Sequence, residues 1–153
     1  MDEHFQQLIS ELHGKYQELI SMSPVSIDTV SANCPTGGVY LFSENGKNLY
    51  AGRTKRKISL RLKGHVNTAN DCPFAWRLAR EEMRVEKASY KTKLSRKDLL
   101  SQPEFKKAYE SAKNHIRIMD VRFVGEQDPL KQALLEIYVS VISNAKYNDF
   151  DTH

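Results

Sequence analysis

One carboxylate stands out because of the residues around it. Glu136 is the only charged residue between Gln132 and Ala145, in a stretch otherwise rich in leucine, isoleucine and valine. A carboxylate on a largely buried helix costs free energy unless a cation or a metal ion neutralises it. A place at the solvent edge, or in a structural ion pair, would give the same pattern. Glu136 is therefore either a structural carboxylate or a ligand for a cation.

A second stretch is strongly basic, although the net charge of the chain is only +4. No acidic residue occurs between Glu44 and Asp71, whereas that window holds seven cations: Lys47, Arg53, Lys55, Arg56, Lys57, Arg61 and Lys63. Such a local positive field is typical of proteins that bind phosphate backbones. A solvated surface would carry the same charges, so this stretch alone leaves both interpretations open.

Residues 37–54, GGVYLFSENGKNLYAGRT, are typical of a β-hairpin that carries Tyr40 on one arm and Tyr50 on the other. If the two residues Asn45 and Gly46 form the turn, the two tyrosines lie on opposite faces of the hairpin. If a type I turn instead ends in a bulge at Gly46, Tyr40 pairs with Tyr50 and both share a face. We favour the bulge because it gathers the aliphatic residues on the other face: Val39, Leu41, Leu49 and Ala51.

Hydrophobic periodicity and turn residues predict five helices and one further strand: helices over 2–22, 60–66, 73–84, 101–114 and 128–143, and a strand within 116–125. Arg61 and His65 lie four residues apart, and so on one side of the short second helix. Taken alone, this pair is equally typical of an exposed basic helix with a surface histidine.

These elements predict an α+β fold with a small, mostly antiparallel sheet built on the β-hairpin and flanked by helices. A doubly wound parallel sheet is not expected, because strands and helices do not alternate regularly along the chain. The chain has 153 residues, which is enough to bury a sizeable core. We expect residues 1–36 to form an N-terminal helix and linker that pack on or extend a domain of residues 37–153.

Composition argues against several classes of protein. The two cysteines, Cys34 and Cys72, are too few and too isolated for a disulfide framework or a zinc site. No apolar run approaches the roughly 20 residues that are needed to span a bilayer. The first residues, MDEHFQQLIS, are acidic and polar, unlike a secretory signal. We therefore expect a cytoplasmic protein with no membrane partner.

Two short motifs give the hairpin a family resemblance. GVY at 38–40, followed by YAG at 50–52, resembles the paired motif that names the GIY-YIG nuclease family. Arg61 and His65 lie where that family has its helix arginine and a histidine or tyrosine. Arg53 stands where the bacterial excision-repair incision subunit, a member of the family, has a lysine.

The resemblance continues in the last part of the chain. Glu136 is similar to the family's metal-binding glutamate, and Asn148 in YNDF resembles its late asparagine. Val39 and Ala51 replace the middle isoleucines of the two motifs, which a β-sheet core tolerates. The similarity extends over about residues 37–150, and it implies the fold of this nuclease family.

The resemblance implies an endonuclease that hydrolyses DNA phosphodiester bonds with a single divalent metal ion, Mg²⁺ or Mn²⁺. Glu136 would hold the metal through hard carboxylate oxygens, and Arg61 would clamp the scissile phosphate. The metal would stabilise the leaving oxygen and the charge on phosphorus. Four further cations would bind the nucleic acid: Lys55, Arg56, Lys57 and Lys63.

The resemblance also implies that Tyr40 is the general base that acts on the attacking water. A free tyrosine has a pKa of about 10. We expect the charges of Arg53, Arg61 and the metal to lower the pKa of Tyr40. Tyr50 would bind the water or the phosphate, and His65 would accept the proton. Asn148 would orient the phosphate or the metal-binding carboxylate.

Two other functions are consistent with the same residues. The first is a non-catalytic module that binds nucleic acid on this fold, with salt-sensitive affinity and no cleavage. The second is an interaction protein whose N-terminal helix binds a partner, or a second copy in a homodimer. DNA is the expected nucleic acid, and the sequence leaves RNA and the specificity open.

Overall fold

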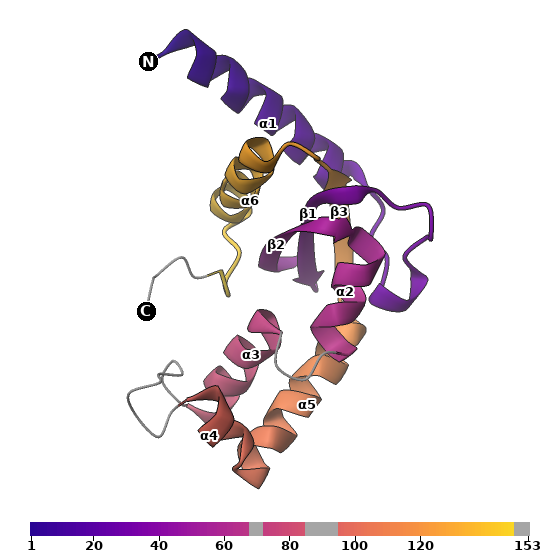
Figure 1. Cartoon of the computed structure of the whole chain (residues 1–153), viewed down its shortest axis with the longest axis vertical. Helices are drawn as coiled ribbons and strands as arrows, with labels where there is room; N and C mark the ends of the chain where they lie inside the picture. Colours follow the sequence, from indigo (N-terminus) through magenta and orange to yellow (C-terminus); the bar gives the residue numbers. More distant parts are fainter. Residues whose placement is uncertain (68–71, 85–94, 149–153) are drawn as a thin grey trace. The chain divides into compact units, whose positions relative to one another are not determined.

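The computed structural model describes residues 1–67, 72–84 and 95–148. The chain forms two compact units, of which the first consists of Met1–Arg61 and Met119–Asn148. The second is formed by the described part of Leu62–Ile118 (Figure 1). The N-terminal segment thus shares a unit with the hairpin. Residues 149–153 of the predicted domain lie outside the described residues.

The first unit contains a three-stranded antiparallel sheet. Its strands, in the spatial order β2-β1-β3, are β1 (Thr36–Glu44), β2 (Lys47–Lys57) and β3 (Asp120–Gly125). β1 is the central strand because both other strands pair with it. Together with the helices around it, this sheet confirms the predicted α+β fold.

The turn of the hairpin differs from the predicted one. Asn45 and Gly46 both have positive φ angles, 52° and 76°, and the flanking residues Glu44 and Lys47 pair with each other. The turn is therefore a two-residue turn of type I′, and the predicted type I turn with a bulge at Gly46 is wrong. The physical reason is that type I′ matches the right-handed twist of the strands, and Asn-Gly tolerates two positive φ angles.

A bulge at a different place still brings both tyrosines to one face. Leu49 is the extra residue between the Phe42–Tyr50 pair and the next pair of the hairpin. Tyr40 and Phe42 are two residues apart on β1, so their side chains point to the same face as Tyr50. The predicted shared face is present, although Tyr40 pairs with Gly52 and not with Tyr50.

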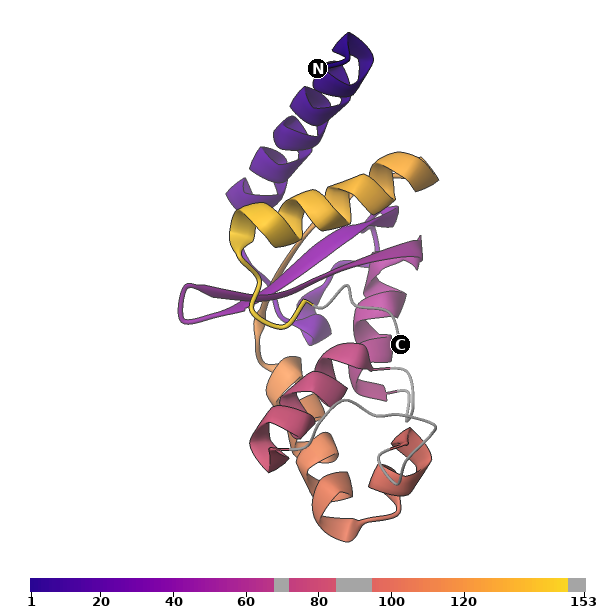
Figure 2. The same ribbon diagram turned by 90° about the vertical axis from the view of Figure 1, so that its left-hand side faces the viewer.

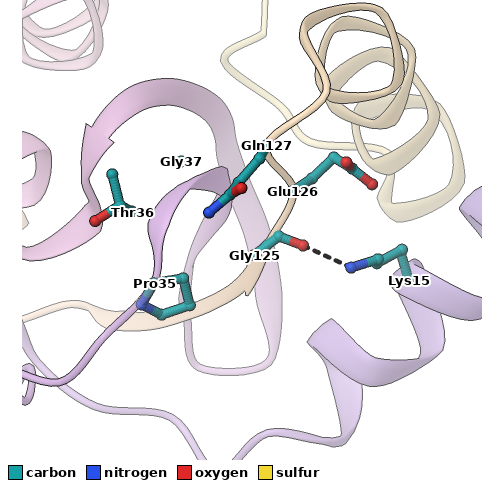
Figure 3. A pocket seen from close by; sticks show the side chains of 7 residues that line it. All are labelled: Lys15, Pro35, Thr36, Gly37, Gly125, Glu126 and Gln127. Atoms are coloured by element: carbon teal, nitrogen blue, oxygen red, sulfur yellow. Dashed lines mark hydrogen bonds between the residues drawn. The ribbon is translucent and has the colours of Figure 1, made fainter.

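Helices complete the first unit: α1 (Glu3–Ser21), the short 3₁₀ helix η1 (Ile27–Thr29), α6 (Pro129–Ser143) and the start of α2 (Ile58–Asn67). α6 lies across the two strands of the hairpin (Figure 2). α1 is tied to β3 by Lys15, whose Nζ donates a 2.8 Å hydrogen bond to the carbonyl of Gly125 (Figure 3). It is tied to α6 by His13, whose Nδ1 lies 2.7 Å from the hydroxyl oxygen of Tyr138.

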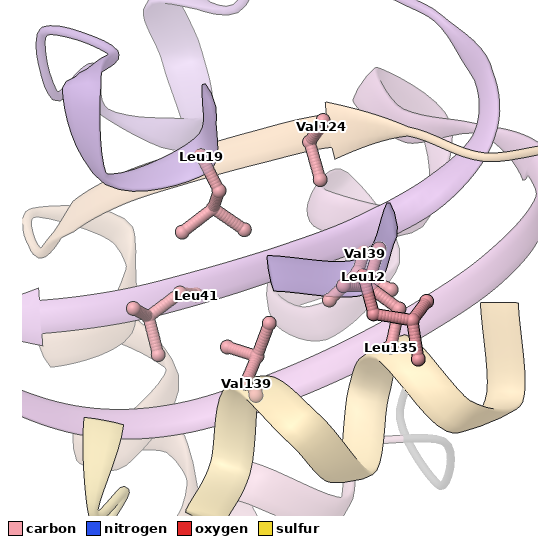
Figure 4. Close-up of a cluster of buried hydrophobic side chains, with 8 residues drawn as sticks. Leu12, Leu19, Val39, Leu41, Val124, Leu135 and Val139 are labelled. Atoms are coloured by element: carbon pink, nitrogen blue, oxygen red, sulfur yellow. The ribbon is translucent and has the colours of Figure 1, made fainter. Parts of the chain in front are cut away.

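A cluster of buried aliphatic side chains joins α1 and α6 to the sheet (Figure 4). Its members come from both helices and all three strands: Leu12, Leu19, Val39, Leu41, Ala51, Val124, Leu135 and Val139. Val39, Leu41 and Ala51 belong to the hairpin face that faces away from the tyrosines, as predicted. The predicted amphipathic stripe of the first helix is therefore buried within its own chain.

The described part of the second unit is helical. It contains α3 (Pro73–Met83), α4 (Arg96–Leu100), α5 (Pro103–Arg117) and the end of α2. Trp76 packs against Phe105 and Tyr109, with ring centroids 5.4 and 4.6 Å apart. α4 was not predicted. The strand predicted within 116–125 begins only at Asp120, because the preceding apolar residues close the end of α5.

No helix among the described residues is both long and apolar enough to cross a membrane. α1 has 19 residues, of which only Leu12 and Leu19 are fully buried. Two large apolar residues of α1 face solvent, since Phe5 is 43% and Ile20 is 46% exposed. The helix thus has a polar exposed side with isolated apolar residues.

Leu19→Ala should lower the free energy of unfolding by about 2–5 kcal/mol, because it removes a fully buried side chain from the core cluster. The matched variant is Ile20→Ala, one residue along the same helix, which should change stability by less than about 1 kcal/mol. Denaturant unfolding followed by circular dichroism measures both. Equal effects of the two substitutions would contradict a core role for α1.

Candidate functional site

Tyr40 reaches from the central strand across the neighbouring strand β2. It pairs with Gly52, and a Cβ atom at residue 52 would overlap the ring and hydroxyl of Tyr40. Gly52 therefore gives the phenol its path over β2, and any side chain there would displace it. The first motif needs glycine at Gly38 for a similar reason, because a Cβ atom there would overlap the carbonyl oxygen of Val124 on β3.

The Tyr40 phenol lies among three other groups of the predicted site. The Arg61 guanidinium, from α2, hydrogen-bonds to the phenol, and the side chains of Tyr50 and Glu136 act on it electrostatically. Phe42 packs edge-on against Tyr40, with ring centroids 5.8 Å apart. Side chains from β2, α2 and α6 thus all act on one phenol of β1 in the first unit.

The pKa of Tyr40 moves in the direction opposite to the expected one. Burial is the largest cause and raises the pKa well above its usual value, since the side chain is only 1% exposed. Tyr50 and Glu136 raise it further, whereas the charge and the hydrogen bond of Arg61 lower it. Of the cations that were expected to lower the pKa, Arg61 does so, but desolvation outweighs its effect. The phenol holds its proton at neutral pH.

Glu136 is paired with Arg53. The Nε atom of Arg53 lies 2.9 Å from Oε2 of Glu136, and the two side chains are 41% and 21% exposed. Arg53 belongs to the face of β2 that α6 covers, next to Gly52, which explains why it meets a residue of that helix. Of the two interpretations of this carboxylate, the structure contains the ion pair.

Glu136 also has the chemistry of a metal ligand. Mg²⁺ commonly binds proteins through one or two carboxylates, while water and substrate phosphates fill its remaining positions. Among the described residues no three His, Cys, Asp or Glu side chains come together as a cage. A Mg²⁺ or Mn²⁺ ion at Glu136 would therefore need water and a phosphate substrate to complete its shell.

Asn148 binds the backbone of β2. Its Oδ1 accepts a 2.7 Å hydrogen bond from the backbone N–H of Ala51, and its Nδ2 donates a 2.8 Å bond to the carbonyl of the same residue. The adjacent Tyr147 donates its N–H to the carbonyl of Leu49 over 2.8 Å. Both polar atoms of the Asn148 amide thus hold the outer edge of β2, and its part in orienting the phosphate or Glu136 stays a prediction.

His65 lies one helical turn after Arg61 in α2, within the second unit. Its side chain is fully buried, so the surface histidine predicted from the residue alone is wrong. Its part in proton transfer stays a prediction. Three of the predicted nucleic-acid ligands are exposed, namely Lys55, Arg56 and Lys63, while Lys57 is half-buried.

Sequence reasoning treated Gly52 as part of a motif and missed why the position needs glycine. It also missed Phe42, whose contact with Tyr40 follows from strand spacing and was available as a signal. A cavity of about 380 Å³ contains none of the predicted site residues, and is lined by Lys15, Pro35, Thr36, Gly37, Gly125, Glu126 and Gln127 (Figure 3). The site at Tyr40 is therefore separate from this cavity.

Asn148→Ala should destabilise the protein by about 1–2 kcal/mol, because it removes two hydrogen bonds from an edge strand. The backbone amide of Ala51 should then exchange with solvent hydrogen faster, as measured by NMR. Lys146→Ala, two residues earlier in the same exposed segment, is the control and should leave this exchange unchanged. Unchanged exchange in Asn148→Ala would contradict this structural role.

Tyr40 should make stability fall at alkaline pH. Below about pH 10 both the folded and unfolded states keep this proton, so the contribution is constant. Above that pH the unfolded state loses the proton first, because the pKa of Tyr40 is raised in the folded state, and the unfolding free energy decreases. Tyr40→Phe should reduce this decrease, and Tyr16→Phe is the control. Identical pH profiles for both variants and the wild type would contradict a raised pKa.

Comparison with known proteins does not assign this chain to a family. No family model, no curated protein and no solved structure matches this chain. The resemblance to the GIY-YIG nucleases thus rests on the two motifs and the residues that follow them. The function is inferred below from the chemistry of the site.

Proposed function

We propose that the protein is a metal-dependent endonuclease, a hydrolase that cleaves phosphodiester bonds of DNA. The observation that carries this proposal is that Arg61 hydrogen-bonds to the phenol of Tyr40, while Tyr50 and Glu136 act on it electrostatically. These side chains come from separate elements, and together they offer a cation, hydroxyl donors and a metal-binding carboxylate. Phosphoryl transfer needs these three kinds of group.

Arg61 is the proposed clamp for the scissile phosphate. It is half-buried, and it already donates one hydrogen bond to the phenol of Tyr40. A guanidinium has five N–H donors, so others remain for the oxygens of a phosphate. Because charge grows on these oxygens during the reaction, a fixed and partly desolvated guanidinium stabilises the transition state more than the ground state.

Tyr40 is proposed to act on the attacking water. Its protonated phenol first positions the water by a hydrogen bond, and it can remove a proton only after it has lost its own. Neutralising Glu136 would favour that step, because the charge of this carboxylate raises the pKa of Tyr40. Tyr50, on the same face of the hairpin, would hold the water or the phosphate.

Glu136 would hold the metal ion, together with water and the phosphate. A bound Mg²⁺ or Mn²⁺ would stabilise the negative charge on the phosphate and on the leaving oxygen. Glu136 suits this part because its side chain is 21% exposed and so is reachable from solvent. Its place in the middle of a helix that packs on the core keeps the carboxylate fixed.

Nucleic acid is the proposed partner. Lys55 and Arg56 on β2 and Lys63 on α2 are exposed and carry the charge of the basic stretch. DNA is the expected nucleic acid, with RNA as the alternative. A homodimer through α1 would have to use exposed residues such as Phe5 and Ile20, because Leu12 and Leu19 are buried in the chain's own core.

A non-catalytic nucleic-acid-binding module is the second candidate. Two observations favour it: the buried phenol of Tyr40 keeps its proton, and an oxygen of Glu136 is bonded to Arg53. A protonated phenol and a paired carboxylate are both expected in a site that binds phosphate by charge alone. Such a module would bind DNA with an affinity that falls steeply with salt, and would not cut it.

Cleavage of supercoiled plasmid in the presence of Mg²⁺ or Mn²⁺ tests the first proposal. Glu136→Gln keeps the shape of the side chain and removes its charge, and Arg61→Ala removes the clamp. Each should slow cleavage roughly a hundredfold or more, as is usual when one charged transition-state group is lost. Glu104→Gln, an exposed glutamate in the first turn of α5, is the matched control and should cut like the wild type.

The outcomes separate the two candidates. Undiminished cleavage by both site variants would refute the assigned site. Salt-sensitive binding of DNA without cleavage of linear, branched, supercoiled or single-stranded forms would establish the binding module instead. Loss of cleavage in Glu104→Gln as well would mean that the variants act through folding, which circular dichroism detects.

A further inference from the structure

Arg53 occupies an unusual position for a surface cation. It follows Gly52 directly in β2, and its guanidinium bonds to Glu136 over 2.9 Å although 41% of its side chain remains exposed. The next cations of the strand, Lys55 and Arg56, are exposed. Arg53 thus belongs to the basic stretch of β2 and is itself bonded to the proposed metal ligand.

The ion pair with Arg53 competes with a metal ion for the same carboxylate. The guanidinium occupies Oε2 of Glu136, and its positive charge repels any second cation that approaches. Arginine remains charged at every pH at which proteins fold, so this competition cannot be relieved by deprotonating it. A lysine at this position would bind the carboxylate as a flexible point charge and could lose its proton.

A phosphate offers Arg53 a second partner. Guanidinium groups bind phosphate oxygens through parallel hydrogen bonds, and such charge-assisted bonds are among the strongest in proteins. The partial exposure of Arg53 leaves room for the side chain to turn toward solvent and toward a strand of nucleic acid. Turning away would free the oxygen of Glu136 at the moment when phosphate oxygens arrive to complete the shell of a metal ion.

We propose that Arg53 is an internal counter-ion that couples metal binding to substrate binding. Without nucleic acid it neutralises Glu136 and keeps metal affinity low. When a phosphate backbone binds, Arg53 transfers to it, and Glu136 becomes available to the metal. This inference rests on the proposed function and adds to it the order in which nucleic acid and metal bind.

The coupling has a reciprocal consequence. If nucleic acid raises the affinity for metal by displacing Arg53, then metal raises the affinity for nucleic acid by the same factor. Removing the guanidinium should therefore strengthen metal binding to the free protein and weaken nucleic-acid binding. A purely structural ion pair predicts neither change, because its loss would alter only stability.

Direct titration of Mn²⁺ into the full chain without nucleic acid tests the inference, and calorimetry gives the dissociation constant. Arg53→Gln should bind Mn²⁺ about tenfold more tightly than the wild type, which corresponds to one charge-assisted contact. Arg53→Lys keeps the cation and should stay close to the wild type. Lys47→Gln removes one charge at the hairpin end of the same strand and is the control for net charge. The double variant Arg53→Gln, Glu136→Gln should lose the gain.

A second measurement uses DNA binding in the presence of a chelator, followed by fluorescence anisotropy at several salt concentrations. Arg53→Gln should weaken binding severalfold and lower the salt slope by about one unit. Unchanged Mn²⁺ affinity in Arg53→Gln, with binding that still depends on Glu136, would overturn the coupling and leave the proposed function intact. Mn²⁺ binding that never depends on Glu136, with or without DNA, would overturn both.

Discussion

The candidate site depends on one close approach, that of the Tyr40 phenol to the backbone of Gly52. Tyr40 stands on the central strand, whose backbone is enclosed by a neighbour on each side. Because residue 52 has no Cβ atom, the phenol passes over β2, where Arg61 and Glu136 act on it. A larger residue at this position would displace the phenol of Tyr40 from the influence of Arg61 and Glu136.

Burial and charge oppose each other at that phenol, and the outcome decides what the site contains at rest. Desolvation keeps the Tyr40 hydroxyl protonated, while the hydrogen bond from Arg61 acts in the other direction. The resting site therefore holds a neutral phenol, two guanidinium groups and one carboxylate. Glu136 connects these groups, because it pairs with Arg53 and also raises the pKa of Tyr40. A substitution of Glu136 would consequently affect both Arg53 and Tyr40.

Periodicity predicted α1 and α6 and the aliphatic face of the hairpin, because burial of one face leaves a regular trace in the sequence. The turn was harder, since Asn45-Gly46 fits two registers and the bulge at Leu49 has no marker of its own. The pairing of Glu136 was one of two interpretations that no local pattern could separate. The bond between Asn148 and Ala51 could not be predicted, because the two residues are 97 apart in the sequence and only the fold brings them together.

The outer edge of β2 has to satisfy two opposing demands. An exposed edge strand invites pairing with other chains, so proteins cover it or place charges on it. Within the described residues, hydrogen bonds from Lys146, Tyr147 and Asn148 cover the edge from Asn48 to Ala51. Beyond Gly52 the strand continues with Arg53, Lys55 and Arg56, whose charges discourage strand pairing. In the proposed function the same charges would attract phosphate, so protection of the edge and recruitment of nucleic acid would depend on the same residues of the strand.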